Sequence, residues 1–124
     1  NTYLNSPLFL DNNFCVKDKP LTYFAGQITG VEGYVESIAS GLVSAIAIDR
    51  KLRNLSPINW DNRTVIGALS CYVTQENKDF QPMNANFGIL KPLDYRVRSK
   101  AEKKKAQAEI ALKAIKEIKE IINE

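Results

Sequence analysis

With 124 residues, the chain is long enough for one small domain with a modest core, and its net charge is +3. It has no histidine, which excludes a Ser-His or Cys-His catalytic pair, and its two cysteines, Cys15 and Cys71, lack metal-like spacing. We therefore expect no metal site, and two unclustered cysteines suit a reducing cytoplasm. The most apolar stretch, residues 41–48, is too short to cross a bilayer, and residues 1–10 do not resemble a secretory leader.

Residues 1–20 mix turn-forming residues with short apolar runs, so we expect a loop with extended pieces. The apolar and aromatic run LTYFA then predicts a short buried strand over 21–27. Glycines follow at positions 26, 30 and 33. Because glycine has no Cβ, the backbone at these positions can turn tightly, adopt positive φ and approach a ligand closely.

A helix is predicted from about residue 33 to residue 54. Its apolar residues are spread nearly all round, which is typical of a buried helix: Val35, Ile38, Ala39, Leu42, Val43, Ile46 and Ile48. A strand, a glycine turn and a helix N-terminus together present backbone N–H groups to a phosphate or to the electron-rich edge of a flavin. The same arrangement also serves merely to connect a strand to a helix, so the pattern leaves both interpretations open.

The remainder of the chain predicts two more helices, over 63–74 and 96–123, separated by a mostly irregular segment over 75–93. The first offers as core residues Val65, Ile66, Leu69, Tyr72 and Val73. The second is amphipathic and is expected to pack against something apolar through Ala108, Ala111, Leu112, Ile115, Ile118 and Ile122. We expect residues 1–93 to form one unit and residues 94–124 a C-terminal basic helix.

The positive charge is concentrated near the C-terminus. Residues 1–90 carry seven basic and eight acidic side chains, whereas residues 91–124 carry ten and six. The run RVRSKAEKKK, residues 96–105, could bind RNA phosphates. The alternative is a solvated helix face whose lysines pair with Glu102, Glu109, Glu117 and Glu120. No aromatic residue between the lysines could stack on a base.

Two blocks of sequence resemble one known family. The run GQITGVEGYVESIASGLVSAI, residues 26–46, resembles the C-terminal part of the folate- and FAD-dependent (uracil-5-)-methyltransferases, which make 5-methyluridine in tRNA. The run FQPMNANFGIL, residues 80–90, is similar to the other C-terminal signature of that family. The resemblance covers residues 1–93 and implies the C-terminal part of a glutathione-reductase-like, Rossmann-type α/β FAD-binding domain, helix-rich as an isolated fragment.

This resemblance implies a flavoenzyme in which NAD(P)H reduces FAD and methylenetetrahydrofolate supplies the carbon. The product would be a methyl group on the fifth carbon of a tRNA uridine, at position 54 of the T-loop. A ribosomal RNA uridine is the alternative substrate, because the Lys-, Asn- and Ile-rich composition suits an AT-rich genome. The family's GxGxxG motif and its functional cysteines lie upstream, so the resemblance assigns no catalytic residue here. It implies a fragment that needs the N-terminal part of the enzyme and is inactive alone.

The resemblance implies cofactor contacts in both blocks: Gly26, Gln27, Thr29, Gly30, Val31, Glu32, Gly33, Tyr34, Asn84 and Asn86. The amide of Gln27 could bond a ribityl hydroxyl, N–H groups near Gly33 could stabilise negative charge on reduced flavin, and Tyr34 could stack on flavin or folate. The alternatives are an ordinary core aromatic for Tyr34 and charges favoured by the helix N-terminus for Glu32 and Glu36. The asparagines could equally bond their own loop.

Two further interpretations belong to other functional classes. The chain could be a small RNA-binding module that acts through its basic run, residues 96–105. It could also be an association domain held to a partner by Leu112, Ile115, Ile118 and Ile122.

Overall fold

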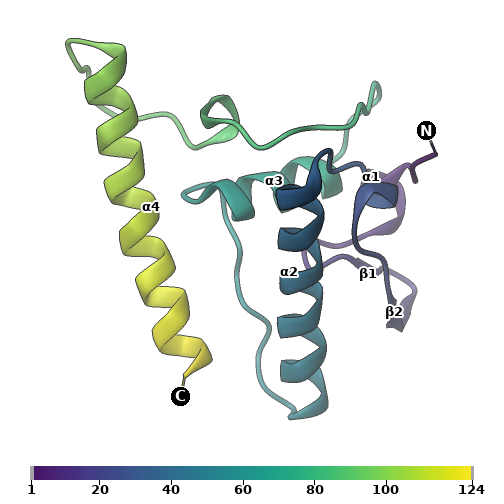
Figure 1. The fold of residues 1–124 in the computed structure, drawn as a ribbon. Coiled ribbons are helices and arrows are strands. Elements are labelled where there is room, and N and C mark those ends of the chain that lie inside the picture. Colours follow the sequence, from purple (N-terminus) through teal and green to yellow (C-terminus); the bar gives the residue numbers. More distant parts are fainter. Residues whose placement is uncertain (1, 124) are drawn as a thin grey trace.

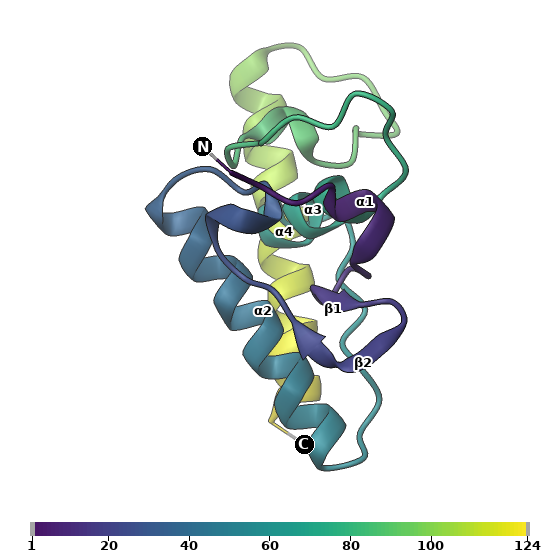
Figure 2. The same cartoon turned by 90° about the vertical axis from the view of Figure 1, so that its right-hand side faces the viewer.

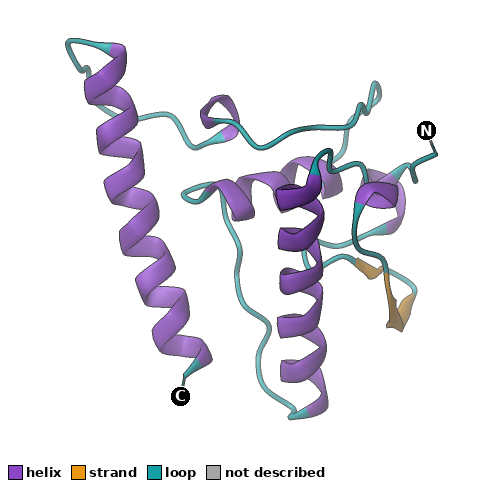
Figure 3. Cartoon of the chain, viewed as in Figure 1, coloured by secondary structure: helices purple, strands orange, loops and turns teal. Residues whose placement is uncertain are grey.

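Helices dominate the computed structural model, which describes residues 2–123 (Figures 1 and 3). In chain order the elements are α1 (Ser6–Phe9), β1 (Cys15–Val16), β2 (Lys19–Tyr23), a 3₁₀ turn η1 (Gln27–Thr29), α2 (Tyr34–Leu52), α3 (Val65–Thr74), a 3₁₀ turn η2 (Phe87–Ile89) and α4 (Lys100–Ile122). The helix-rich character agrees with the prediction. The sheet in the described residues is a small antiparallel hairpin, and a parallel sheet of the Rossmann type is not seen among them.

The strand predicted over 21–27 is found over Lys19–Tyr23, but it is not buried. It pairs with β1 in an antiparallel register, Cys15 opposite Tyr23 and Val16 opposite Lys19. Leu21 is 83% exposed, because β1 pairs with the edge of β2 and leaves this face of the strand uncovered. The chain leaves the extended conformation at Gly26, whose φ is 87°, and residues 27–29 form a 3₁₀ turn instead of continuing the strand.

The three long helices begin close to the predicted positions, and each start has a local cause. Gly33, with φ 105°, precedes α2. The Thr64 hydroxyl accepts a hydrogen bond from the Gly67 N–H and caps α3. Ser99 caps α4 by accepting from the Glu102 N–H, while the Glu102 carboxylate accepts from the Arg98 N–H at 3.2 Å. Side-chain acceptors of this kind satisfy N–H groups that the first helical turn leaves without a partner.

The core lies where α2 and α3 meet the N-terminal segment. Its most buried side chains include Leu10, Phe14, Val31, Val43 and Val73, each at most 1% exposed. Of the residues predicted for the helix over 63–74, Leu69 and Val73 are buried, and Ile66 and Tyr72 pack against the core. Ile118 of α4 joins the same core, so the C-terminal helix packs on the rest of the chain.

Helix α2 is not buried all round, contrary to the prediction. Its inner face carries the buried residues Ser40, Val43, Ser44, Ala47 and Arg50. The opposite side is a continuous exposed apolar stripe, which we call the outer face of α2: Val35, Ile38, Leu42, Ala45, Ile48 and Leu52. Nothing in residues 2–123 covers this stripe. None of the helices in this range is both long and apolar enough to cross a membrane.

Helix α4 packs through a face that overlaps the predicted one in part: Ile118 is buried and Ile122 packs against the core, as predicted. The buried positions are Gln107, Ala114 and Ile118, whereas Leu112 is 70% and Ile115 40% exposed. The apolar face of this helix is wider than the surface that the rest of the chain covers. Leu112, at one edge of the apolar face, is therefore exposed to solvent. Helices α2 and α4 run in the same direction, as Figures 1 and 2 show, and in the view of Figure 1 the connection between α2 and α3 passes between them.

Candidate functional site

The two sequence blocks meet in space. Val31 and Met83 form a parallel bridge, in which the Met83 N–H donates to the Gly30 carbonyl at 2.8 Å and the Glu32 N–H donates to the Met83 carbonyl at 2.9 Å. We call residues 26–34 the glycine segment and residues 83–88 the asparagine loop. The backbone contact places the asparagine loop beside the N-terminus of α2, as the resemblance to one family of enzymes implied.

Glu36 ties the asparagine loop to α2. Its carboxylate accepts hydrogen bonds from the Ala85 N–H at 3.0 Å and from the Asn84 amide at 3.3 Å. The same Asn84 amide donates to the Glu32 carbonyl at 2.9 Å. The bond from the Ala85 N–H is the main reason that the pKa of Glu36 lies below its ordinary value of 4.5. The sequence predicts Glu36 only as a charge that the N-terminus of its own helix favours. Nothing in the sequence indicates its hydrogen bond to Ala85, 49 residues away.

We expect Glu36→Gln to loosen the asparagine loop. A carboxylate accepts the Ala85 N–H more strongly than an amide oxygen does, so the Ala85 amide should exchange with solvent faster in the variant. Folding lowers the pKa of Glu36, so the hydrogen bonds to its carboxylate stabilise the fold above pH 4.5. This stabilisation is lost as the pH falls below that value and the carboxylate is protonated. Amide exchange and the pH dependence of the Ala85 amide shift measure both effects. Glu32→Gln is the matched control, and equal responses of the two variants would contradict the assignment.

Several residues predicted to contact a cofactor fill the core instead. Thr29 and Val31 have no exposed surface, and the Thr29 hydroxyl donates to the Gly26 carbonyl at 2.8 Å. Gly30 is also buried, with φ 98°, and a Cβ there would overlap the ring of Phe80. These three positions shape the segment from within, and the side chains of Thr29 and Val31 offer no exposed surface to a ligand in this chain.

The other predicted contacts lie on the surface. Tyr34 is 92% exposed, which rules out the alternative of a core aromatic in this chain. Together with Gln27, Gly33 and Ser37 it lines a shallow hollow at the start of α2. A second hollow beside it includes both Gln27 and Glu32 in its lining.

The remaining residues predicted to contact a cofactor, Gly26, Asn84 and Asn86, form hydrogen bonds with other residues of this chain. Asn84 and Asn86 are exposed, and the Asn86 amide donates to the Asn84 carbonyl, as the loop alternative predicted. Gly26 is half-buried, and its N–H donates to Ser40 Oγ at 2.7 Å. The surface available to a ligand is therefore formed by Gln27, Glu32, Gly33 and Tyr34, with the asparagine loop beside them.

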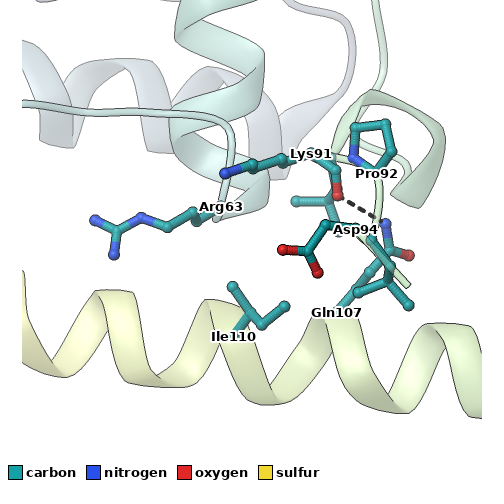
Figure 4. Close-up of a pocket in the computed structure, with 8 residues that line it drawn as sticks. Arg63, Lys91, Pro92, Asp94, Gln107 and Ile110 are labelled. Atoms are coloured by element: carbon teal, nitrogen blue, oxygen red, sulfur yellow. Dashed lines mark hydrogen bonds between the residues drawn. The ribbon is translucent and has the colours of Figure 1, made fainter.

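Another pocket, which the sequence did not indicate, lies where α4 meets the segment before it (Figure 4). It encloses about 100 Å³. Gln107 holds the two sides together by donating to the Lys91 carbonyl at 3.2 Å, and Ile110 and Asp94 line the same space. Arg63 at its rim bonds Asp61 at 3.0 Å and Glu117 of α4 at 3.3 Å. Burial raises the pKa of Asp61, but the hydrogen bonds and the charge of Arg63 together outweigh it, so the pKa lies below its ordinary value. The bond from Arg63 to Glu117 connects the segment before α3 to α4.

Comparison with known proteins finds relatives over nearly the whole chain. The family described as glucose inhibited division protein A matches residues 1–56. Curated proteins named methylenetetrahydrofolate–tRNA-(uracil-5-)-methyltransferase TrmFO match nearly the whole chain. That of Thermotoga neapolitana is 50% identical over 121 residues, that of Streptococcus suis 50% over 119, and that of Bacillus licheniformis 45% over 119.

These matches cover 94–97% of this chain but 27–28% of each relative, so the chain spans a little over a quarter of their length. The matched lengths take in both sequence blocks and nearly all of α3 and α4. Over almost its whole length, this chain is therefore similar to a part of the methylenetetrahydrofolate–tRNA-(uracil-5-)-methyltransferases.

Proposed function

We propose that this chain is the C-terminal part of a flavoenzyme that methylates the fifth carbon of uridine 54 in the T-loop of tRNA. Methylenetetrahydrofolate is the carbon donor, and NAD(P)H reduces the FAD. The observation that carries the proposal is the identity of 45–50% to proteins named methylenetetrahydrofolate–tRNA-(uracil-5-)-methyltransferase. The contact between the glycine segment and the asparagine loop supports it, because both blocks of the family resemblance then border one surface.

The residues on this surface fit a flavin. Gly33 precedes α2 and supplies no side-chain cap, so the N–H groups of Tyr34 and Val35 can face an electron-rich ring edge, while the Glu36 carboxylate accepts from its own N–H. The exposed ring of Tyr34 offers a stacking surface, and the Gln27 amide can bond a hydroxyl. A bound flavin supplies the redox chemistry that converts a folate-derived carbon into a methyl group. In this proposal Gln27, Gly33 and Tyr34 hold and orient the flavin, and Asn84 and Asn86 border the folate.

The exposed outer face of α2 indicates that another part of the enzyme packs against this helix. Val35 and Ile38 are 73% and 71% exposed, and Leu42 is 53% exposed on the same stripe. An apolar stripe of this length on a helix is normally covered, because leaving it in water forgoes about 25 cal/mol for each Å² of apolar surface. We propose that the N-terminal part of the enzyme covers this stripe and completes a Rossmann-type FAD-binding domain around it.

Titration of FAD into the chain, with and without the N-terminal part of the enzyme, tests this proposal. We expect the flavin absorbance to shift only when both parts are present, because this chain holds the ring end of the site and lacks a pyrophosphate loop. Circular dichroism establishes that each part is folded. If two folded parts together leave the flavin spectrum unchanged, the proposed function is wrong.

Replacing Gly33 by Val should strip FAD from the reconstituted enzyme. The backbone at Gly33 has φ 105° and ψ 159°, a conformation that costs a residue with a side chain about 1–3 kcal/mol. A Cβ there would also lie 2.8 Å from a carboxylate oxygen of Glu36. The flavin-to-protein ratio after gel filtration measures the loss. Circular dichroism of the same sample is the control and should match that of the parent enzyme, so that loss of flavin is not loss of the fold. Normal flavin content in Gly33→Val would count against this contact.

A further inference from the structure

The first turns of α4 carry three lysines on the side of the helix that faces the rest of the chain. Residues that share a face of an α-helix recur at spacings of three, four and seven. Lys100, Lys103 and Lys104 precede Gln107 by these spacings, and Gln107 begins the buried face of the helix. All three lysines are nevertheless exposed, because the body of the chain covers α4 only from Gln107 onward. We call Lys100, Lys103 and Lys104 the lysine face.

The acidic residues of α4 do not neutralise the lysine face. None of its three lysines has an acidic residue three or four positions away on either side. By contrast, Lys105, Lys113 and Lys116, on the outward side, each have a glutamate at such a spacing. In residues 2–123 the ion pairs join Arg53 to Asp49 and Arg63 to Asp61 and Glu117, so none involves the lysine face. Intrahelical pairing therefore accounts for the outward lysines and not for these three.

The position of the lysine face is also unfavourable for the helix itself. Lys100 is the first residue of α4, and Lys103 follows one turn later. The N-terminal end of a helix carries a partial positive charge, so cations there cost a few tenths of a kcal/mol rather than stabilising the helix. Neither packing nor helix stability explains three unpaired lysines at this end, which points to an anionic partner.

The lysine face lies at the same end of the molecule as the candidate site. Because α2 and α4 run in the same direction, their N-terminal ends point the same way, and the chain between α3 and α4 crosses over this end (Figures 1 and 2). Arg96 and Arg98 on this crossing are exposed and add to the positive charge. The opposite charges of Lys91 and Asp94 at the neighbouring pocket cancel, so the excess positive charge at this end comes from residues 96–104.

We propose that the lysine face binds backbone phosphates of the RNA substrate and holds the RNA at the end of the molecule where the candidate site lies. The inference rests on the proposed function. It concerns phosphates rather than bases, because no aromatic side chain lies between the lysines. The contact should therefore add affinity without sequence preference, and the affinity should fall steeply with salt.

The test compares two triple variants of the enzyme reconstituted with its N-terminal part. One changes the lysine face, Lys100→Gln with Lys103→Gln and Lys104→Gln. Its matched control changes the outward lysines, Lys105→Gln with Lys113→Gln and Lys116→Gln. Both remove three charges from one helix, and glutamine preserves helix propensity. Binding of a fluorescent T-arm RNA hairpin is measured over a range of salt concentrations, and flavin absorbance is recorded for each sample.

We expect the lysine-face variant to lose about tenfold or more in affinity near 0.1 M salt and the logarithmic salt slope to fall by roughly two units. The control should lose less than about threefold, since its charges act only at a distance and are screened. Equal losses, or no loss in the lysine-face variant, would overturn the proposal. Because flavin absorbance is recorded separately, failure of the flavin assignment is distinguishable from failure of RNA binding.

Lysine acylation read by mass spectrometry separates RNA from a protein partner. RNA should protect the lysine face from acylation in the reconstituted enzyme and leave Lys113 and Lys116 reactive. Protection by the N-terminal part alone, without RNA, would mean that an acidic protein surface covers these lysines and would overturn the proposal.

Discussion

Replacing Gly67 by Ala should destabilise the chain by about 3 kcal/mol, although the same change in the middle of a helix usually stabilises. Gly67 is buried in the first turn of α3, where the backbone carbonyl of Asp61 passes so close that a Cβ would overlap it. The Cβ would also lie 2.9 Å from the Thr64 hydroxyl that caps the helix. Backbone atoms cannot move aside as a flexible side chain can, so the substitution strains the turn and weakens the cap.

Gly41→Ala in α2 is the matched control for this prediction. A Cβ at Gly41 meets nothing within 4 Å, so the variant should gain about 0.5–1 kcal/mol from the lower backbone entropy of the unfolded chain. Urea unfolding followed by circular dichroism measures both variants, and their midpoints should move in opposite directions. A Gly67→Ala midpoint equal to or above that of the parent chain would show that the loop at Asp61 yields more easily than the structure implies.

Truncation of Phe80 should cost about 3–5 kcal/mol and should also separate the two halves of the candidate site. The ring is 8% exposed and lies 5.9 Å, centroid to centroid, from both Tyr3 and Tyr72. Its edge occupies the space that a side chain at Gly30 would fill. Phe80→Ala therefore leaves a cavity beneath the bridge between Val31 and Met83 and removes the packing that keeps it closed.

Phe87→Ala is the control, because it removes the same side chain from the same block of sequence. Phe87 is 40% exposed in η2, so its truncation should cost less than about 1 kcal/mol. Unfolding free energies compare the two variants, and amide exchange at Glu32 and Met83 reports on the bridge. Faster exchange should accompany Phe80→Ala alone. Similar losses of stability in both variants would contradict the assigned role of Phe80.

The sequence predicted the helices well and their buried faces less well. Periodicity places α2, α3 and α4 within a few residues of their observed bounds. Periodicity also identifies apolar residues, but it does not say which of them a partner covers. In α2 the apolar side chains split into a buried face with Val43 and an exposed stripe with Val35 and Ile38. The split depends on which part of the protein is present to pack against the helix.

In the candidate site, too, the sequence identified the segments involved but not which of their residues are buried. The resemblance brought the glycine segment and the asparagine loop into one prediction, and the structure joins them through the bridge of Val31 to Met83. Within the glycine segment, however, the resemblance could not distinguish Thr29 and Val31, which are buried, from Gln27 and Tyr34, which are exposed. Residues 29–31 are buried where the segment turns against Phe80, whereas Gln27 before them and Tyr34 after them are exposed. This is a property of the chain path rather than of the residue types.

The sequence by itself determined the local features of this protein: where helices begin, where glycines allow a positive φ, and where charge accumulates. Each of these follows from interactions between residues a few positions apart, so a short stretch of sequence contains the cause. The tertiary structure alone decided that Glu36 bonds Ala85, that Asp61 forbids a side chain at Gly67, and that Lys100, Lys103 and Lys104 continue the inner face of α4. Those features join residues far apart in the chain or depend on what packs against a helix, and only the folded path brings them together.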